Sequence, residues 1–332
     1  MLFIFFLLFA GLMECREATN EEWDLAIKLI STSTFFHSRQ WLSIWENIYP
    51  NCGAKCYYFN CNDGQEIYLP GLQRKLFRNL VSRFDSSVVG TYGGLLSLQS
   101  ISSTKYQTVF DFLKGKMSFY ITQNSSPSSF GLPHLKPMDE TYIVDISNWS
   151  EDQQNYSTSA ISQLKKTNKI GLLVREVKNL NEWKDYYALY QESSLRWGKS
   201  KETLYPFKLF EKIMNLPENV HKLWLVYDGK IPVYGCLVFF HHKTAYHWHG
   251  SGSNEGLTKG ASYLLQDHII RYLKEKGFDY YDMMSNGGND SLKIFKSKFR
   301  PSFLPIYESI YKRGTYRFLE GVSRLNQRLF GR

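Results

Sequence analysis

The residues between Tyr246 and Met284 combine a glycine-broken polar loop with a helix start, a pattern that suits an anionic or acyl-bearing ligand. Gly250 and Gly252 follow an alternating aromatic segment, and glycine lets the backbone turn there and come close to a ligand. Further along the chain a helix begins, and its free N–H groups favour a phosphate. This helix start consists of Lys259, Gly260, Ala261 and Ser262. The alternative is an ordinary connection between a strand and a helix.

Two histidines precede this loop at strand spacing. His247 and His249 are two residues apart, so we expect both to point to one face of a strand and Trp248 to the other. Imidazole titrates near neutral pH and can act as a base or an orienting group, although a strand histidine with a satisfied hydrogen bond is the plainer interpretation. We expect no metal site here, because no carboxylate or cysteine has compatible spacing.

The whole chain is long and apolar enough to form two domains. It has 332 residues, of which 43% are hydrophobic and 16% aromatic. Lys and Arg exceed Asp and Glu by 40 to 31, a net charge of +9, and ten of the basic residues follow Ser291. This excess favours an anionic partner such as a phosphate-rich substrate, tRNA or a lipid headgroup, the alternative being a solubilising tail.

The cysteines and the first residues bear on location. Five cysteines, an odd number with no CxxC pair, favour a reducing cytoplasm. The opening "MLFIFFLLFAGLM" is too short to span a bilayer as a helix and has no preceding Lys or Arg, so we expect the domain to begin at Met13. A weak signal anchor is the alternative.

Two halves of the chain show the same order of elements. A helix, three antiparallel strands, a helix and a further strand occur twice, with hairpin turns at Asp63-Gly64 and Asp228-Gly229. The polar run "DISNWSEDQQNYSTSA" separates the halves. The order predicts a mixed α/β fold with two similar domains at 13–150 and 151–312, each a largely antiparallel sheet flanked by helices, and a tail at 313–332.

From about Trp23 to Lys312 the chain resembles the FemAB-like proteins, which pair two acyltransferase domains of the GNAT type. The resemblance rests on the order of seven short segments, which are "TFFHSRQWLSIW", "IYLPGL", "TYGGLLS", "QLKKTNKIGLLV", "LRWG", "KGFDYYDM" and "SLKIFKSKF". It implies transfer of an acyl or aminoacyl group to an amine, often on a cell-wall precursor or another glycan, in the cytoplasm. Two departures stand out. The loop "GLTKGASY" keeps only part of the GNAT phosphate pattern, and Arg300 replaces the glycine that usually follows the phenylalanine-lysine motif.

The resemblance assigns roles to particular residues. Lys296, the lysine of the family-like "FK", is expected to stabilise negative charge at the reaction centre or on a substrate phosphate, and the alternative is a surface lysine. His249 is expected to face the cleft and to serve as a base or an orienting group. The loop with Gly250 and Gly252 becomes the candidate donor site, for an acyl-coenzyme A or an aminoacyl-tRNA as co-substrate, with no tightly bound cofactor.

The resemblance also suggests where the acceptor binds. Tyr92 and Gly93 are expected to face an acceptor cleft, Arg196 to pair with an acidic group, and Trp197 to stack on a sugar ring. The acceptor would be a small-molecule or lipid-linked glycan. The competing class of function is a non-catalytic protein of this fold that binds an anionic or glycan ligand.

The last residues predict a basic amphipathic helix. Phe318, Val322, Leu325 and Leu329 recur at helical spacing, and three arginines fall on neighbouring faces. Such a helix either packs on its own domain or lies on an anionic membrane surface, which would place the protein at the inner face of the membrane.

Overall fold

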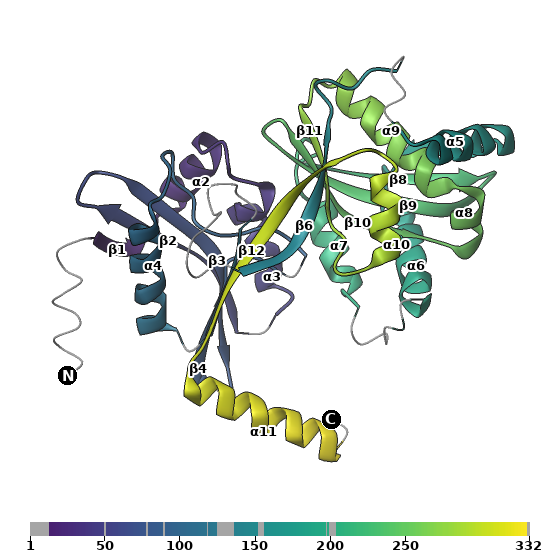
Figure 1. Cartoon of the computed structure of the whole chain (residues 1–332). Helices are drawn as coiled ribbons and strands as arrows, with labels where there is room; N and C mark the ends of the chain where they lie inside the picture. The colour runs from purple at the N-terminus through teal and green to yellow at the C-terminus, as the bar shows by residue number, and fades with distance from the viewer. Residues whose placement is uncertain are drawn as a thin grey trace. The chain divides into compact units, whose positions relative to one another are not determined.

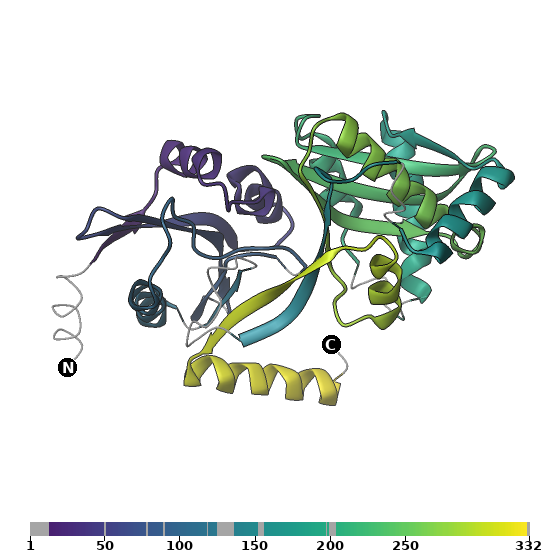
Figure 2. The same cartoon turned by 45° about the horizontal axis from the view of Figure 1, so that its top comes forward.

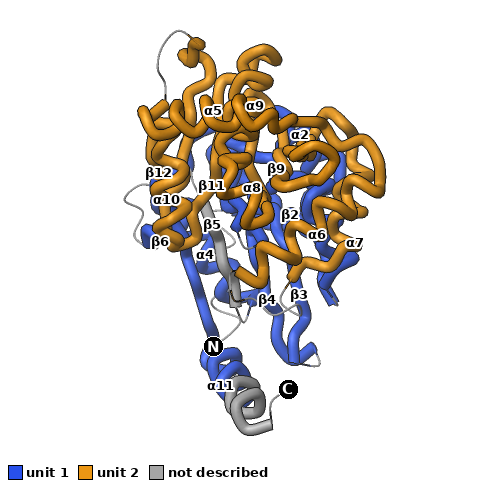
Figure 3. Tube along the Cα trace, turned by 90° about the vertical axis from the view of Figure 1, so that its right-hand side faces the viewer, with its two compact units in different colours: residues 1–138, 305–332 blue, residues 139–304 orange. Residues whose placement is uncertain are grey.

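The computed structural model describes residues 13–49, 51–77, 79–88, 90–117, 119–124, 136–151, 156–196, 198 and 204–330. The chain forms two compact units, and the first unit contains both ends of the chain. Residues 1–138 and 305–332 make up the first unit, and residues 139–304 make up the second (Figure 3). The expected start at Met13 and its signal-anchor alternative concern residues 1–12, which lie outside the described residues.

The first unit is a six-stranded sheet with helices on its faces (Figure 1). Its sheet order is β1-β2-β3-β4-β5-β12, in which β4 and β5 are parallel and the pairs β1–β2, β2–β3, β3–β4 and β5–β12 are antiparallel. The elements are β1 (Met13–Glu17), α2 (Asn20–Leu29), η1 (Phe35–His37), α3 (Arg39–Glu46), β2 (Cys52–Cys61), β3 (Glu66–Leu76), β4 (Val81–Asp85), α4 (Ser103–Lys116), β5 (Phe119–Asn124), β12 (Ser302–Lys312) and α11 (Gly314–Phe330).

The second unit repeats this arrangement. Its sheet order is β7-β8-β9-β10-β11-β6, in which β10 and β11 are parallel and β11 and β6 antiparallel. The elements are β6 (Lys136–Asp145), α5 (Thr158–Ile170), β7 (Leu173–Glu176), α6 (Leu180–Arg196), α7 (Phe207–Met214), β8 (His221–Asp228), β9 (Ile231–His241), β10 (Thr244–Gly252), α8 (Asn254–Lys259), α9 (Ala261–Glu275), β11 (Tyr280–Ser285) and α10 (Asp290–Ser297).

The match between the two sheets confirms the repeated mixed α/β fold. In each unit a strand, two helices, three antiparallel strands, helical structure and a parallel strand follow one another. The sixth strand of each sheet lies outside this repeated order. β12, near the end of the chain, completes the first sheet, and β6, which precedes the second repeat, completes the second sheet. The division therefore falls at Met138 rather than near residue 150, and the end of the expected second domain belongs to the first unit.

Helices cover the two faces of the second sheet (Figure 1). α5 and α9 pack on one face over Trp224, Cys236 and Val238. α6 packs on the other face, where a Cβ added at Gly235 would meet the ring of Tyr186 at 2.6 Å. The glycine is needed for this close approach of helix and strand. Along β9, Cys236 and Val238 thus face α5 and α9, whereas Gly235 faces α6. The partners of β10 residues on β9 therefore show which face each histidine of β10 is on.

Local signals account for the turns and helix starts. Gly64 and Gly229 have φ values of +79° and +60°, as the predicted Asp-Gly hairpins require. Ser157 caps α5 by accepting a hydrogen bond from the Ala160 N–H, and Gly171 ends the helix with a φ of +80°. These features need only neighbouring residues, so sequence patterns predict them well.

One predicted strand in the first half lies elsewhere. The apolar segment "SSVVGTYGGLLS" is not the third antiparallel strand of the repeat, because that strand is β4, which precedes the segment and ends at Asp85. A single bridge between Tyr68 and Leu96 is the sheet contact that this segment makes among the described residues. The chain folds tightly there, since a Cβ at Gly93 would come within 2.3 Å of the Ser86 carbonyl oxygen.

Candidate active site

The neighbouring strands β10 and β11 separate part-way along their length. They pair in parallel from Thr244 with Tyr280 to Tyr246 with Asp282, and the pairing stops there although β10 continues to Gly252 and β11 to Ser285. Both strands are irregular at this point, because β10 has a register shift between His247 and His249 and β11 has one after Asp282. Beyond this point the backbone groups that the two strands would share in a ladder need other partners.

Lys296 lies beside the irregular part of β11. Its side chain comes from α10, is 6% exposed, and donates hydrogen bonds to the carbonyl oxygens of Met284 at 2.9 Å and Ser285 at 2.8 Å. Burial lowers the pKa of Lys296 from its usual 10.5 to about 8, against the opposing effect of Asp282 and Asp139. An ammonium has three N–H donors, so one remains beyond these two carbonyl bonds.

Asp282 holds the irregular strand in shape. Its Oδ1 accepts a hydrogen bond from the Thr141 hydroxyl at 2.5 Å and one from the Met284 N–H at 2.7 Å. Met284 has a φ of +61°, a conformation that is rare for a residue with a side chain. Sequence reasoning did not select Asp282, although a lone carboxylate inside the apolar strand "YYDMM" is a usable signal.

The two histidines of β10 point to opposite faces of the sheet, which corrects the expectation that they share one. His247 stacks on Tyr281 and bonds to its hydroxyl at 3.0 Å on the α9 side. His249 contacts Tyr186 and Tyr190 on the α6 side. The register shift places Trp248 as an extra residue between them, and a one-residue slip exchanges the faces of a strand.

His247 lies within electrostatic reach of both other basic groups. Desolvation lowers the pKa of His247 to about 3, and the charges of Lys296 and His249 act in the same direction. His247 is therefore neutral at physiological pH. The charge of Lys296 therefore reaches His247 near the point where the pairing of β10 and β11 ends, while His249 lies on the other face of β10.

Tyr186 fixes the orientation of His249. The Tyr186 hydroxyl lies 2.5 Å from Nδ1 of His249 and 3.0 Å from the His249 carbonyl oxygen. The carbonyl can only accept, so the single phenolic proton goes to it and Nδ1–H donates to the phenol oxygen when both bonds form. Burial raises the pKa of Tyr186 well above its usual value, which keeps that proton in place. This arrangement puts the lone pair of the imidazole on Nε2, the atom that a base requires.

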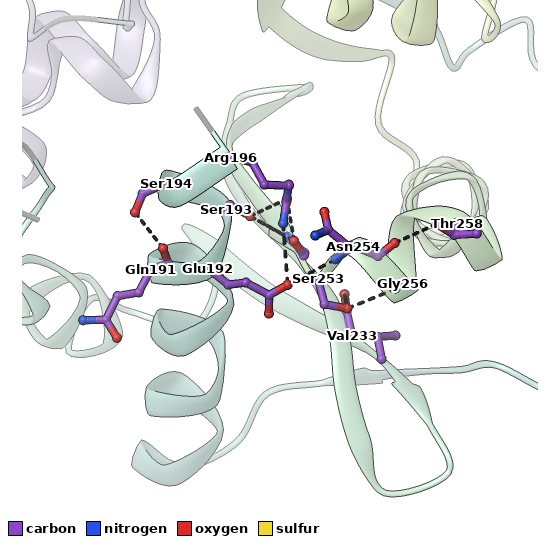
Figure 4. A network of polar contacts seen from close by, with 11 residues as sticks. Gln191, Glu192, Ser193, Ser194, Arg196, Val233, Ser253, Asn254, Gly256 and Thr258 are labelled. Atoms are coloured by element: carbon purple, nitrogen blue, oxygen red, sulfur yellow. Dashed lines mark hydrogen bonds and ion pairs between the residues drawn. The ribbon is translucent and has the colours of Figure 1, made fainter. Parts of the chain in front are cut away.

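Arg196 belongs to the loop after β10 rather than to a separate acceptor site. Its guanidinium donates to the Gly252 carbonyl oxygen at 2.6 Å and to the Ser193 hydroxyl at 2.9 Å. The Gly252 N–H donates to the same hydroxyl at 3.0 Å. Hydrogen bonds from the end of α6 therefore hold the turn between β10 and α8 in place (Figure 4).

The start of α8 is already occupied by side chains. The Asn254 N–H donates to the Glu192 carboxylate at 3.2 Å, and the Gly256 N–H donates to the Ser253 hydroxyl at 3.0 Å. Figure 4 shows Glu192 reaching toward this turn from α6. A carboxylate at a helix start takes the place that a phosphate would use.

The expected phosphate site at the start of α9 has a different environment. Ala261 and Ser262 are buried, and the contacts of Gly260 are with Gln163 and Thr167 of α5. Lys259 pairs with Asp228 and, at 2.7 Å, with Glu255. The predicted binding role of Lys259, Gly260, Ala261 and Ser262 is corrected to a structural one, because α8 and α5 cover this helix start and two carboxylates neutralise the lysine.

Two of the expected acceptor residues are core residues of the first unit. Tyr92 is buried against Phe36, and the tight packing of Gly93 on Ser86 leaves no room for a side chain. Their expected contact with an acceptor is replaced by packing. Trp197 lies outside the described residues. A half-buried stacked pair, Trp248 and Tyr205 with ring centroids 5.8 Å apart, lies beside His249 and was not selected from the sequence.

A family comparison agrees with this geometry. Residues 159–295 match the model described as an acetyltransferase (GNAT) domain, and they fall within the second unit. The second unit thus matches the GNAT domain model over most of its length. Its β10 and β11 are the parallel strands that separate, and Lys296 follows the matched range directly.

Solved structures extend the likeness to the whole chain. FemX has a TM-score of 0.69 at 14% identity, covering 92% of this chain and 100% of its own. L-PGS from Bacillus licheniformis has a TM-score of 0.56 at 14% identity, with coverages of 96% and 98%. A tandem GNAT protein from the clavulanic acid biosynthesis pathway has 0.52 at 8%, with coverages of 90% and 98%. The chain therefore has the tandem GNAT fold, and the resemblance to FemAB-like proteins is confirmed at the level of the fold.

Two further findings complete the comparison. No curated protein matches the chain. Within the described ranges, no helix is long and apolar enough to cross a membrane, and no three His, Cys, Asp or Glu side chains come together as a metal ion would need.

Proposed function

We propose that this protein is an N-acyltransferase whose donor binds between β10 and β11 of the GNAT domain. The observation that carries the proposal is the early end of the pairing between these strands, beside the Lys296 ammonium. The carbonyl oxygen of an acyl group placed there could accept a hydrogen bond from the third N–H of Lys296. A fixed N–H group lowers the reaction barrier most when it faces negative charge that develops in the transition state.

The reaction would form one C–N bond and break one bond to the donor. A neutral amine attacks the acyl carbonyl carbon, and negative charge builds on the carbonyl oxygen near Lys296. The amine then loses a proton to Nε2 of His249, either directly or through water. The acyl carbon finally releases a thiolate or an alkoxide, which takes up a proton as it leaves.

An aminoacyl ester is the donor that we favour over acyl-coenzyme A. Glu192 fills the start of α8, and Lys259 is paired with two carboxylates, so the loop offers little to a pyrophosphate. One solved structure of this fold, with a TM-score of 0.58 at 11% identity, is the C-terminal domain of a putative lysylphosphatidylglycerol synthetase from Agrobacterium fabrum. We propose an amine on a glycan or another cell-envelope precursor, free or lipid-linked, as the acceptor.

The test is mass spectrometry of transfer products. The purified full chain is incubated with acetyl-coenzyme A or with mixed aminoacyl-tRNAs, each together with amino-sugar and lipid-linked peptide acceptors. A mass increase on an acceptor that depends on aminoacyl-tRNA supports the proposal. A mass increase that depends only on acetyl-coenzyme A would identify acyl-coenzyme A, and not an aminoacyl ester, as the donor. Binding of an acceptor without any transfer would favour the alternative of a non-catalytic binding protein.

A further inference from the structure

The C-terminal helix α11 docks on the first unit through a face that the sequence pattern did not single out. Tyr316, which is 5% exposed, and Leu319 pack against Phe77, Val81 and Leu76 at the tip of the β3–β4 hairpin. Figure 1 shows the start of α11 beside β4, and Figure 2 shows the same helix leading on from the end of β12. The rings of Tyr316 and Phe77 meet edge to face at 6.1 Å.

The predicted apolar stripe is therefore left uncovered in the first unit where its side chains are described. Phe318 is 70% exposed and Val322 40% exposed. At roughly 100° per residue, these two positions lie about 110° around the helix from the docked pair of Tyr316 and Leu319. The sequence continues the stripe at the same spacing, with Leu325 and Leu329.

The charge around this stripe has one sign. From Lys312 to Arg332 the chain has six basic residues and one acidic residue, Glu320, whose carboxylate already pairs with Lys312 at 3.0 Å. A second copy of this helix would bring like charges together, which opposes self-association. An anionic lipid surface would accept both the apolar stripe and the cations.

We propose that α11 is a membrane-surface helix that places Phe318 and Val322 among the headgroups of an anionic bilayer. Leu80, an exposed leucine next to Val81 at the hairpin tip, adds apolar surface beside the docked helix. Tyr316 and Leu319 fix the helix to the first unit, so binding orients the protein on the surface. This inference stands apart from the transfer chemistry and holds whatever the donor is.

Point substitutions test the proposal better than truncation, because removal of the helix would also remove buried Tyr316. The full chain is sedimented with vesicles of phosphatidylcholine alone and of phosphatidylcholine with phosphatidylglycerol, at low and high salt. We expect binding to the anionic vesicles that weakens with salt. A Phe318→Ser, Val322→Ser double variant should lose it, while a matched control, Leu98→Ser, at a 72% exposed leucine of the same unit, should bind as the unmodified protein does.

The electrostatic part has its own variant. Replacing Arg317 and Arg324 by Gln should weaken binding to anionic vesicles on the order of 30-fold, since each cation near such a surface contributes about fivefold. Equal binding to neutral and anionic vesicles, no binding by the full chain, or no effect of the Phe318 and Val322 substitutions would overturn the proposal. A dimer in sedimentation velocity that the same double substitution abolishes would assign the stripe to a second copy instead. Circular dichroism melting confirms that each variant is folded.

Discussion

Replacing Lys296 by Met tests the role of the buried ammonium most directly. Methionine has nearly the same length and no charge, so the substitution removes the donor to the Met284 and Ser285 carbonyl oxygens with little change in packing. If the third N–H of Lys296 stabilises the oxyanion, turnover should fall on the order of 100- to 1000-fold.

The expected effect on stability is smaller than this loss of activity suggests. Two hydrogen bonds from a charged donor contribute roughly 3 to 6 kcal/mol. The lowering of the pKa of Lys296 from 10.5 to about 8 by burial means that the folded state carries a penalty of roughly 3 kcal/mol for the charge, which the variant no longer has. We therefore expect a net loss of about 0 to 3 kcal/mol in the free energy of unfolding, and a folded protein.

The pH dependence separates the two effects because they have opposite signs. The pKa of Lys296 is lower in the folded than in the unfolded chain, so its penalty is complete below about pH 8 and disappears as the pH rises toward 10.5. Relative to Lys296→Met, the unmodified protein should gain stability across that window. Its turnover should instead decline above about pH 8, as the ammonium loses its proton.

The assay is single-turnover transfer with the donor identified by mass spectrometry, alongside urea unfolding. Lys293→Met is the matched control, because Lys293 lies on the same helix, is half exposed and pairs with Glu140. The control should keep normal turnover. A folded Lys296→Met variant that also keeps normal turnover, or a pH profile that stays flat up to pH 10, would refute the reasoning.

Three further substitutions probe the groups around this lysine. Tyr186→Phe removes the partner that fixes the tautomer of His249, and we expect about a tenfold loss of turnover, equivalent to one hydrogen bond, with a shifted acidic limb of the pH–rate profile; an unchanged profile would mean that the bond is only structural. Arg196→Gln loosens the turn after β10, so the KM for the donor should rise while the KM for the acceptor stays the same, and the reverse result would restore the acceptor role. Asp282→Asn removes a charge that raises the pKa of Lys296, so the alkaline fall in turnover should begin at a lower pH, which a pH–rate series measures directly.

Some of the candidate site was accessible from the sequence. Short motifs in the right order had singled out Lys296, which lies at the irregular part of β11, and His249, which lies at the bulge of β10; their catalytic roles stay predictions. Other predicted residues have structural partners. Arg196 holds the Gly252 carbonyl, and Lys259 is neutralised by Asp228 and Glu255, because such pairings depend on which elements lie side by side.

The sequence alone determined the features that depend on neighbouring residues. The Asp-Gly hairpins and the repeated order of elements are present as predicted, and the serine cap and glycine stop of α5 depend on equally local residues. These patterns were enough to predict two similar α/β units. A local pattern succeeds here because turn geometry, capping and periodicity involve residues only a few positions apart.

Only the tertiary structure decided the features that join distant segments. β12 completes the first sheet and β6 the second, since strand pairing is set by the whole sheet and not by the strand's own residues. An extra residue at Trp248 turned His249 to the opposite face from His247, and no local pattern encodes that slip. Lys296 is buried because β11 supplies two carbonyl oxygens that accept its hydrogen bonds, and no local pattern distinguishes this burial from the alternative of a surface lysine.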